Sequence, residues 1–148
     1  MALARRLLFC CGMISREEIE GRSKRFGVAA LGTIRSLAHR PDAWDATRQL
    51  SRAATSVGAN HRAMRRARSY KEFSSKLQTV TEEIDEACYW LEILLALPDI
   101  TNPELAALYR EACELRAIFA KARATTRSRL DATTHPPHST RPGPDLEP

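Results

Sequence analysis

Apolar residues recur at alternating four- and three-residue steps in the stretch between residues 73 and 94. The residues at these steps are Phe73, Leu77, Val80, Ile84, Ala87, Leu91 and Leu94. This rhythm places all of them on one side of an α-helix. Trp90, Ile93 and Leu97 form a second apolar line beside the first. Because so wide an apolar face must be covered by other helices, the pattern predicts an all-α protein.

Start and stop signals divide the rest of the chain into further helices. Residues 15–18, 69–72 and 101–104 each have the spacing of a capping box, and the last of them has a proline in the first turn. Pro41 is expected to end the first helix, and Asp42 to cap the second. Short connections between helices favour antiparallel neighbours. We therefore predict an antiparallel up-down four-helix bundle.

The bundle is expected to cover residues 15–124. Residues 1–14 form a leader whose apolar run is too short for a secretory signal, and Met13 is an alternative start. The apolar pattern stops near residue 125, so the proline-rich tail 125–148 is predicted to be disordered. No stretch has the length and hydropathy of a membrane-spanning helix.

The four cysteines favour neither a disulfide framework nor a metal site. Cys88 and Cys113 fall in helical apolar patterns, where a free thiol is usually a small core residue. Cys10 and Cys11 are adjacent and lack the spacing of zinc ligands. We therefore expect no metal, no cofactor and a reducing, cytoplasmic location.

Charge is distributed unevenly along the chain. Residues 22–76 contain 13 Lys/Arg and 3 Asp/Glu, whereas residues 77–114 contain one Arg and 9 Asp/Glu. The arginines of the second helix lie away from its apolar side, and they are Arg48, Arg52, Arg62, Arg65, Arg66 and Arg68. Guanidinium groups suit phosphate, so this arginine row is a candidate nucleic-acid-binding site. Because no aromatic residue stands among them, contacts to the nucleic-acid backbone are expected. Pairing with acids of a neighbouring helix or subunit explains the row equally well.

Asn60 falls on the apolar line of the second helix, after Val57 and before Met64. An amide there is expected to fix helix register or oligomeric state inside a core or interface, with binding of a ligand as the alternative. Ala54 and Gly58, four residues apart, predict close approach of another helix.

The acidic third helix offers no complete catalytic set. Glu83 and Glu86 are three residues apart, but no helix supplies the Glu-x-x-His motif that a di-metal centre requires. Salt bridges to the arginine-rich helix are the favoured interpretation. The chain also lacks a nucleophile paired with a base and a phosphate-binding loop, so we expect no enzymatic activity. The aromatic and apolar residues near this helix's end belong to the core or to an oligomer interface: Tyr89, Trp90, Ile93 and Leu97.

Three motifs between residues 56 and 91 are familiar together. The first is Ser56, Gly58, Ala59 and Asn60; the second is Ser69, Glu72, Phe73, Lys76 and Leu77; the third is Glu83, Glu86, Tyr89, Trp90 and Leu91. This set resembles the signature of the bacterial four-helix-bundle family that includes the 23S rRNA-intervening sequence proteins. The agreement extends over about residues 17–124. The chain departs from the family at His61, Ala63 and Met64, where a glutamate is lost and the helix becomes more basic.

The resemblance implies partners. Family members look like homopentameric barrels of bundles, and related accessory proteins of diversity-generating retroelements bind nucleic acid and a reverse transcriptase through basic surfaces. Independently, opposite charges on the second and third helices favour head-to-tail contact and a cyclic homo-oligomer, with five subunits implied by the resemblance alone. We therefore expect an accessory protein that binds RNA or DNA. The alternative is a protein–protein scaffold in which basic and acidic helices of neighbouring subunits pair, with no nucleic-acid role.

Overall fold

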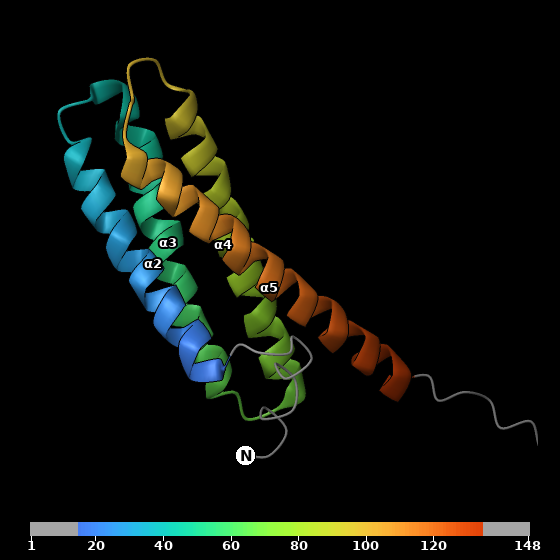
Figure 1. The fold of residues 1–148 in the computed structure, drawn as a ribbon. Helices are drawn as coiled ribbons and strands as arrows, with labels where there is room; N and C mark the ends of the chain where they lie inside the picture. Colours follow the sequence, from blue (N-terminus) through green and yellow to red (C-terminus); the bar gives the residue numbers. More distant parts are fainter. Residues whose placement is uncertain (1–14, 135–148) are drawn as a thin grey trace, which may run out of the picture.

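The computed structural model describes residues 15–134, with side chains to residue 130. Four α-helices and one short 3-10 helix account for nearly all of this part, which contains no strand (Figure 1). They are α2 (Arg16–Ser36), η2 (Pro41–Ala43), α3 (Trp44–Arg65), α4 (Tyr70–Ala96) and α5 (Pro103–Thr134). The all-α class and the four-helix bundle are therefore confirmed. The predicted leader 1–14 and residues 135–148 of the predicted tail lie outside the described residues.

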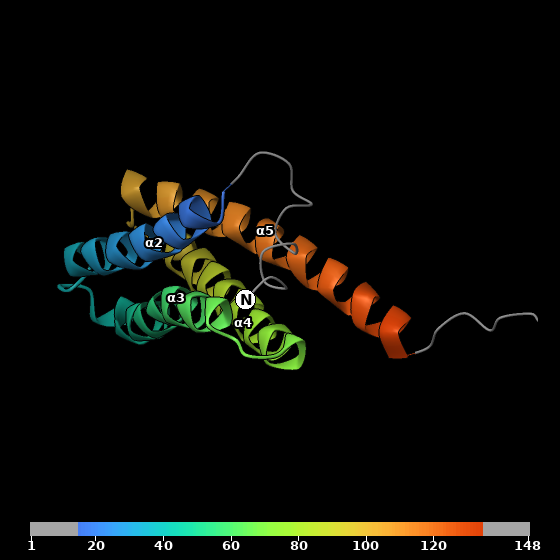
Figure 2. The ribbon, with the colours of Figure 1, turned by 90° about the horizontal axis from the view of Figure 1, so that it is seen from below.

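Helices that are consecutive in the chain are packed on one another. α3 packs against both α2 and α4, and α5 packs mainly against α4, whereas α2 and α5 meet less closely (Figures 1 and 2). At one end of the bundle, Asn102 Nδ2 donates to Ser36 Oγ at 3.0 Å. At the other end, Tyr70 Oη donates to the carbonyl of Thr126 at 3.0 Å. Each of these contacts joins the beginning of one helix to the later part of another.

Side-chain caps begin three of the helices, two of them as predicted. The Ser15 and Ser69 hydroxyls accept from backbone N–H groups three residues on, at 3.1 and 3.0 Å. α5 is capped one residue later than predicted, because Asn102 Oδ1 accepts from the N–H of Glu104 at 2.9 Å. The prediction that Asp42 caps the second helix is wrong. Its carboxylate instead accepts two hydrogen bonds from the Arg40 guanidinium, at 2.9 and 2.7 Å.

The core follows the apolar pattern closely in α4 but not throughout α3. All seven α4 residues at the four- and three-residue steps are buried. In α3 the buried position after Val57 is held by His61, and Asn60 is only half-buried. The Asn60 amide nitrogen donates to the Ser56 carbonyl at 3.1 Å within the same helix. The prediction that Asn60 lies on the buried line is therefore corrected: it lies beside that line.

Two glycines let the backbones of α2 and α3 come close together. A Cβ on Gly27 of α2 would lie 3.2 Å from the carbonyl oxygen of Ala54. A Cβ on Gly58 of α3 would lie 3.4 Å from the carbonyl oxygen of Ser23. Such distances are at or below ordinary van der Waals contact, so the space is used by neighbouring backbone. The close helix approach predicted from Ala54 and Gly58 is confirmed.

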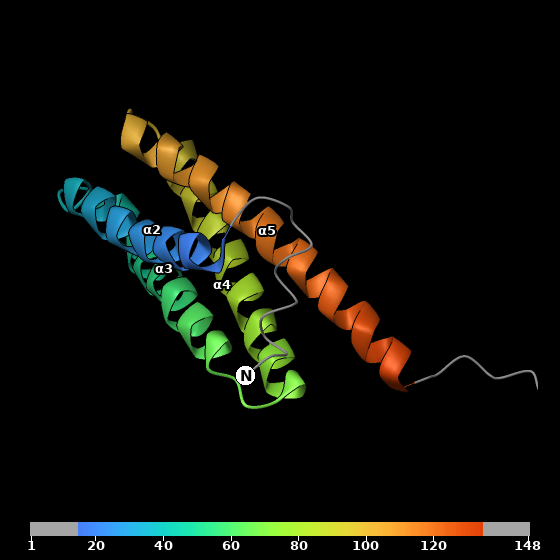
Figure 3. The same cartoon turned by 60° about the horizontal axis from the view of Figure 1, so that its bottom comes forward.

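Helix α5 continues to Thr134, ten residues past the predicted boundary at 124. Extending an existing helix needs only one backbone hydrogen bond per residue, and no proline or glycine interrupts residues 104–135. Figure 3 shows the last turns of α5 projecting away from the other helices. Among the described residues, no helix has the length and hydropathy required to cross a bilayer.

Candidate functional site

In the structure, the predicted arginine row divides into two groups whose acidic partners lie on different helices. In the first half of α3, exposed Arg48 pairs with Asp45 at 3.4 Å. Arg52 crosses to α4 and pairs with Glu86, as expected for salt bridges to the acidic helix. Glu83 does not pair with an arginine: among the described residues its buried Oε2 has no hydrogen-bond partner, and burial raises the pKa of Glu83 above the usual range. This part of the row is thus largely engaged within the chain.

In the last two turns of α3, the arginines turn toward α2. The Arg62 guanidinium lies 3.6 Å from Glu20, while Arg65 hydrogen-bonds Glu20 and lies 3.6 Å from Glu17. Burial alone would raise the pKa of Glu20, but the hydrogen bond and the charge of Arg65 outweigh it and lower that pKa. Glu20 is therefore a carboxylate shared by two guanidinium groups.

Beside this pair lies a hollow of about 280 Å³ lined by Glu20 and three guanidinium side chains. The third of these is Arg66, which is exposed and makes no ion pair within the described part of the chain. The side chain of the next arginine, Arg68, is 92% exposed, and its Nε lies 4.0 Å from Glu72 Oε2, a loose ion pair. Glu17 and Glu20 together offset two of the three positive charges, so the cluster keeps an excess of positive charge suited to an anion.

His61 is next to Arg62 on α3, and the sequence pattern did not predict that it is a core residue. Its imidazole is fully buried, neither nitrogen has a hydrogen-bond partner, and its ring centre is 5.5 Å from that of Phe119. Burial lowers the pKa of His61 to about 4; Glu20 opposes this and Arg65 adds to it. The signal was present, because His61 continues the helical spacing of buried Ala54 and Val57.

The structure brings three further cations near the end of α3, none of which belongs to the predicted arginine row. The hydrogen bond from Tyr70 to Thr126 holds α5 beside the start of α4, where Lys71 is also exposed. Exposed Arg123 and Arg127 flank Thr126 on α5 and were assigned to the edge of the bundle and to the tail. We call the following set the basic end: Arg62, Arg65, Arg66, Arg68, Lys71, Arg123 and Arg127.

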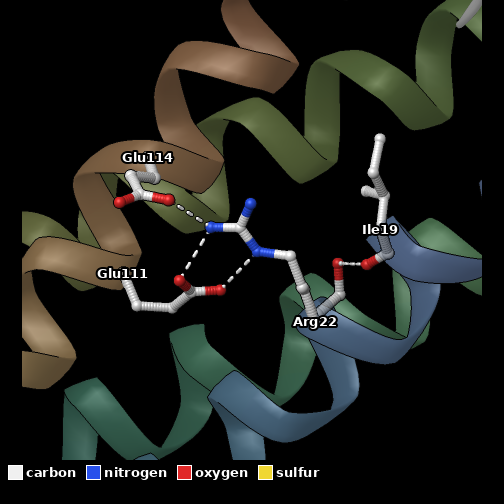
Figure 4. A network of polar contacts seen from close by, with 5 residues as sticks. Ile19, Arg22, Glu111 and Glu114 are labelled. Atoms are coloured by element: carbon white, nitrogen blue, oxygen red, sulfur yellow. Dashed lines mark hydrogen bonds and ion pairs between the residues drawn. The ribbon is translucent and has the colours of Figure 1, made fainter. Parts of the chain in front are cut away.

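A separate polar network joins α2 to α5 (Figure 4). The Arg22 guanidinium donates to both carboxylate oxygens of Glu111, at 2.8 and 2.7 Å, and to Glu114 at 2.6 Å. Its side chain is only 15% exposed, and the hydrogen bonds to Glu111 raise the pKa of Arg22. It borders a groove of about 750 Å³ between the two helices. Because its Nε and Nη2 atoms are held by the two acids of α5, Arg22 is a structural link between the helices.

We expect the change Arg22→Met to lower the free energy of unfolding by about 1–2 kcal/mol, because Glu111 would stay half-buried without its cation. The matched control is Arg25→Met on the same helix, where the arginine is exposed and forms no ion pair within residues 15–130. This control should stay within about 0.5 kcal/mol of wild type. Urea unfolding at pH 7 measures both, and equal effects would contradict the assignment.

The proposed interface residues of α4 are in different environments. Trp90 is half-buried against the core and its Nε1 donates to Glu86 at 3.2 Å. Ile93 and Leu97 are also partly buried against the core. Tyr89 is 53% exposed, with its ring edge-on to Trp90. The structure thus leaves Tyr89 available to a partner and gives the other three residues contacts within the chain.

The family model described as 23S rRNA-intervening sequence protein matches residues 16–121. The chain belongs to this family. Among solved structures, it is similar to a crystal structure of a protein of unknown function from the S23 ribosomal protein family of Bacteroides thetaiotaomicron. The two share 26% sequence identity and a TM-score of 0.65 over 71% of this chain and 97% of that one. A search of curated proteins found no match.

The region shared with the 23S rRNA-intervening sequence proteins includes only part of the basic end. Arg62, Arg65 and Arg66 lie within the matched residues 16–121. Arg123 and Arg127 follow that region, on the later turns of α5. The two α5 arginines of the basic end therefore lie outside the residues matched by the family model.

Proposed function

We propose that this member of the 23S rRNA-intervening sequence protein family is a non-enzymatic protein that binds the backbone of RNA or DNA through its basic end. The observation that carries the proposal is the hollow where Arg62, Arg65 and Arg66 surround a single carboxylate. Phosphate oxygens can accept from such guanidinium groups in the way that Glu20 does.

Exposure and ion pairing decide which of the predicted arginines belong to the proposed site. Arg66 and Arg68 are exposed, and both are better placed for phosphate than Arg52, whose guanidinium already pairs with Glu86. Arg123 and Arg127 are exposed on the part of α5 that Tyr70 contacts at Thr126, and we assign them to the same site. No exposed aromatic residue belongs to the basic end, so the proposed binding is insensitive to base sequence.

The proposal includes assembly and partners. It retains a cyclic homo-oligomer, with five subunits favoured by family resemblance, and a role as accessory factor to a nucleic-acid enzyme such as a reverse transcriptase. Contacts between helix ends, such as Asn102 with Ser36, support an antiparallel up-down order within each bundle. No residue is assigned a catalytic role, a metal or a cofactor, and the proposed location is cytoplasmic.

A protein–protein scaffold without a nucleic-acid role is the second candidate. It is favoured by the fact that five of the six predicted arginines have an acid within the chain: Arg48, Arg52, Arg62, Arg65 and Arg68. Their pairing limits the charge that is free to attract phosphate. On this view the row holds the helices together.

Salt dependence of binding separates the two candidates. Fluorescence anisotropy with single-stranded RNA and duplex DNA should show binding at low salt. Each neutralised phosphate should contribute about −0.7 to −0.9 to the slope of log affinity against log salt concentration. We expect the double change Arg62→Gln and Arg66→Gln to weaken binding about ten-fold and to make this slope less steep by about 1.5.

The control for this experiment is Arg48→Gln, near the opposite end of the same helix. Its effect on affinity should be at least several-fold smaller, because Arg48 lies outside the basic end. No binding at low salt would reject the nucleic-acid function and leave the scaffold. Equal losses for the control and the double variant would reject the placement of the site.

A further inference from the structure

One side of α2 combines exposed apolar residues with cations that form no ion pair in the described part of the chain. Val28 is 62% exposed and Leu31 is 43% exposed; they are two of four large apolar side chains found exposed in residues 15–130. Lys24, Arg25 and Arg35 flank them and form no ion pair within that range. All five residues lie on one side of the helix, at steps of about one turn. We call this set the α2 face.

A complementary surface lies on α4. Tyr89, another of the four exposed large apolar residues, stands between exposed carboxylates at three- and four-residue steps. We call Glu82, Asp85, Tyr89 and Glu92 the α4 face. Asp85 pairs with Arg116 at 3.2 Å.

Within residues 15–130, the two outer acids of the α4 face have only neutral partners. Glu82 accepts a hydrogen bond from the Gln78 amide, and Glu92 accepts one from the Tyr109 hydroxyl, each at 2.8 Å. These two carboxylates are therefore available to cations from outside the chain.

The charges on the two faces have matching spacing. From Lys24 to Arg35 the helix rises about 16 Å, and from Glu82 to Glu92 about 15 Å, at 1.5 Å per residue. In each case the apolar residues lie between the charges. Cations at both ends of one face can therefore meet carboxylates at both ends of the other, while Val28 and Leu31 cover Tyr89.

The two faces of one molecule cannot meet each other. α2 and α4 each pack against α3 and α5, and this puts them at opposite corners of the bundle (Figure 2). Their outer faces therefore point in different directions. A contact between them requires two copies, and each copy keeps one face free for the next.

We propose that the α2 face of one copy docks on the α4 face of a second copy in a head-to-tail contact. This goes beyond nucleic-acid binding and uses none of the basic end. It also replaces the sequence-based expectation that the arginines of the second helix mediate assembly, because Arg52 and Arg62 already pair within the chain. Of the residues predicted for the oligomer interface, Tyr89 takes part in this contact.

Charge reversal on the full chain tests the pairing of faces. One variant reverses the α2 face with Lys24→Glu and Arg35→Glu, and a second reverses the α4 face with Glu82→Lys and Glu92→Lys. A third carries all four changes. Sedimentation equilibrium under reducing conditions, at about 10–100 µM protein and low salt, measures association. Wild type should associate, and each of the first two variants should associate at least about ten-fold more weakly because like charges face each other.

Restoration of association distinguishes docking from loss of fold. The third variant should associate again, because its reversed faces are once more opposite in charge. An equimolar mixture of the first two variants should also associate, because each supplies the unaltered face that the other lacks. Arg110→Glu, an exposed change on α5 outside both faces, should leave association unchanged. Circular dichroism verifies that every variant is folded.

The proposal is overturned if folded wild type remains monomeric throughout this range. It is also overturned if the first two variants associate like wild type, or if the folded third variant does not recover association. Loss of nucleic-acid binding without loss of association would show that the α2 face serves phosphate instead, and it overturns the docking. A monomeric wild type would also reject the cyclic homo-oligomer of the proposed function, whereas nucleic-acid binding through the hollow around Arg66 is tested separately by its salt dependence.

Discussion

The change Gly27→Leu is expected to lower the free energy of unfolding by about 3 kcal/mol, the upper end of the range for overpacking a close contact. A Cβ at this position would already lie 3.2 Å from the Ala54 carbonyl oxygen and 3.7 Å from the Thr55 Cα. Both neighbours are backbone atoms of α3, so a leucine must push the two helices apart. Thermal and urea unfolding of the variant measure the loss.

Gly32 on the same helix provides the matched control. A Cβ there has no neighbouring atom within 4 Å, and the residue is exposed. Gly32→Leu should therefore raise stability by about 0.5–1 kcal/mol, because leucine has the higher helix propensity. Opposite signs for the two changes establish that the α2–α3 contact requires glycine. A stabilising Gly27→Leu would show that the helices can separate without cost.

The second large effect concerns the dependence of stability on pH. The pKa of His61 is about 4 in the folded chain, below the usual value of about 6.5. The unfolded chain therefore binds a proton at His61 more readily than the folded chain does. The contribution of neutral His61 to the free energy of unfolding is complete above about pH 6.5. It is lost as pH falls toward 4, and the total loss is about 3 kcal/mol.

The variant His61→Leu isolates this contribution. It should remove most of the difference in unfolding free energy between pH 7 and pH 4.5, apart from what carboxylates such as Glu20 contribute. At pH 7 the variant should be more stable by about 1 kcal/mol, because two buried nitrogens without partners are removed. Urea unfolding at both pH values measures this. An identical pH dependence in wild type and variant would mean that His61 titrates normally.

The success of the sequence prediction differed from helix to helix for a physical reason. α4 packs against α3 and α5 along a broad stripe, and its strict apolar rhythm identified the buried residues from Phe73 to Leu94. The buried residues of α3 include adjacent pairs such as Ala46 with Thr47 and Ala53 with Ala54, so they form a wider stripe that no single seam of alternating steps describes. The step from Val57 to the next core residue is four residues rather than three. His61 therefore lies in the core, and Asn60 lies beside the buried stripe.

The candidate site was harder to predict than the fold. The sequence identified the arginines correctly as an exposed row, but it could not show that Glu20, distant in the chain, would share Arg62 and Arg65. Which acids meet which arginines depends on helix packing, because ion pairs across helices have no sequence spacing. The contribution of Arg127 was missed for a different reason: α5 continues as a helix after its apolar pattern ends.

The order in which the helices pack has a consequence for how the chain folds. Because α2 packs on α3, α3 on α4 and α4 on α5, most neighbours in space are also neighbours in the chain. Chains with such local contacts lose little loop entropy at each step and fold rapidly. During synthesis α2 can be covered by α3 before α4 has emerged. The contacts of α5, which include its packing on α4 and the Arg22 link to α2, must wait for the last helix, so they complete the fold after α2, α3 and α4 have packed.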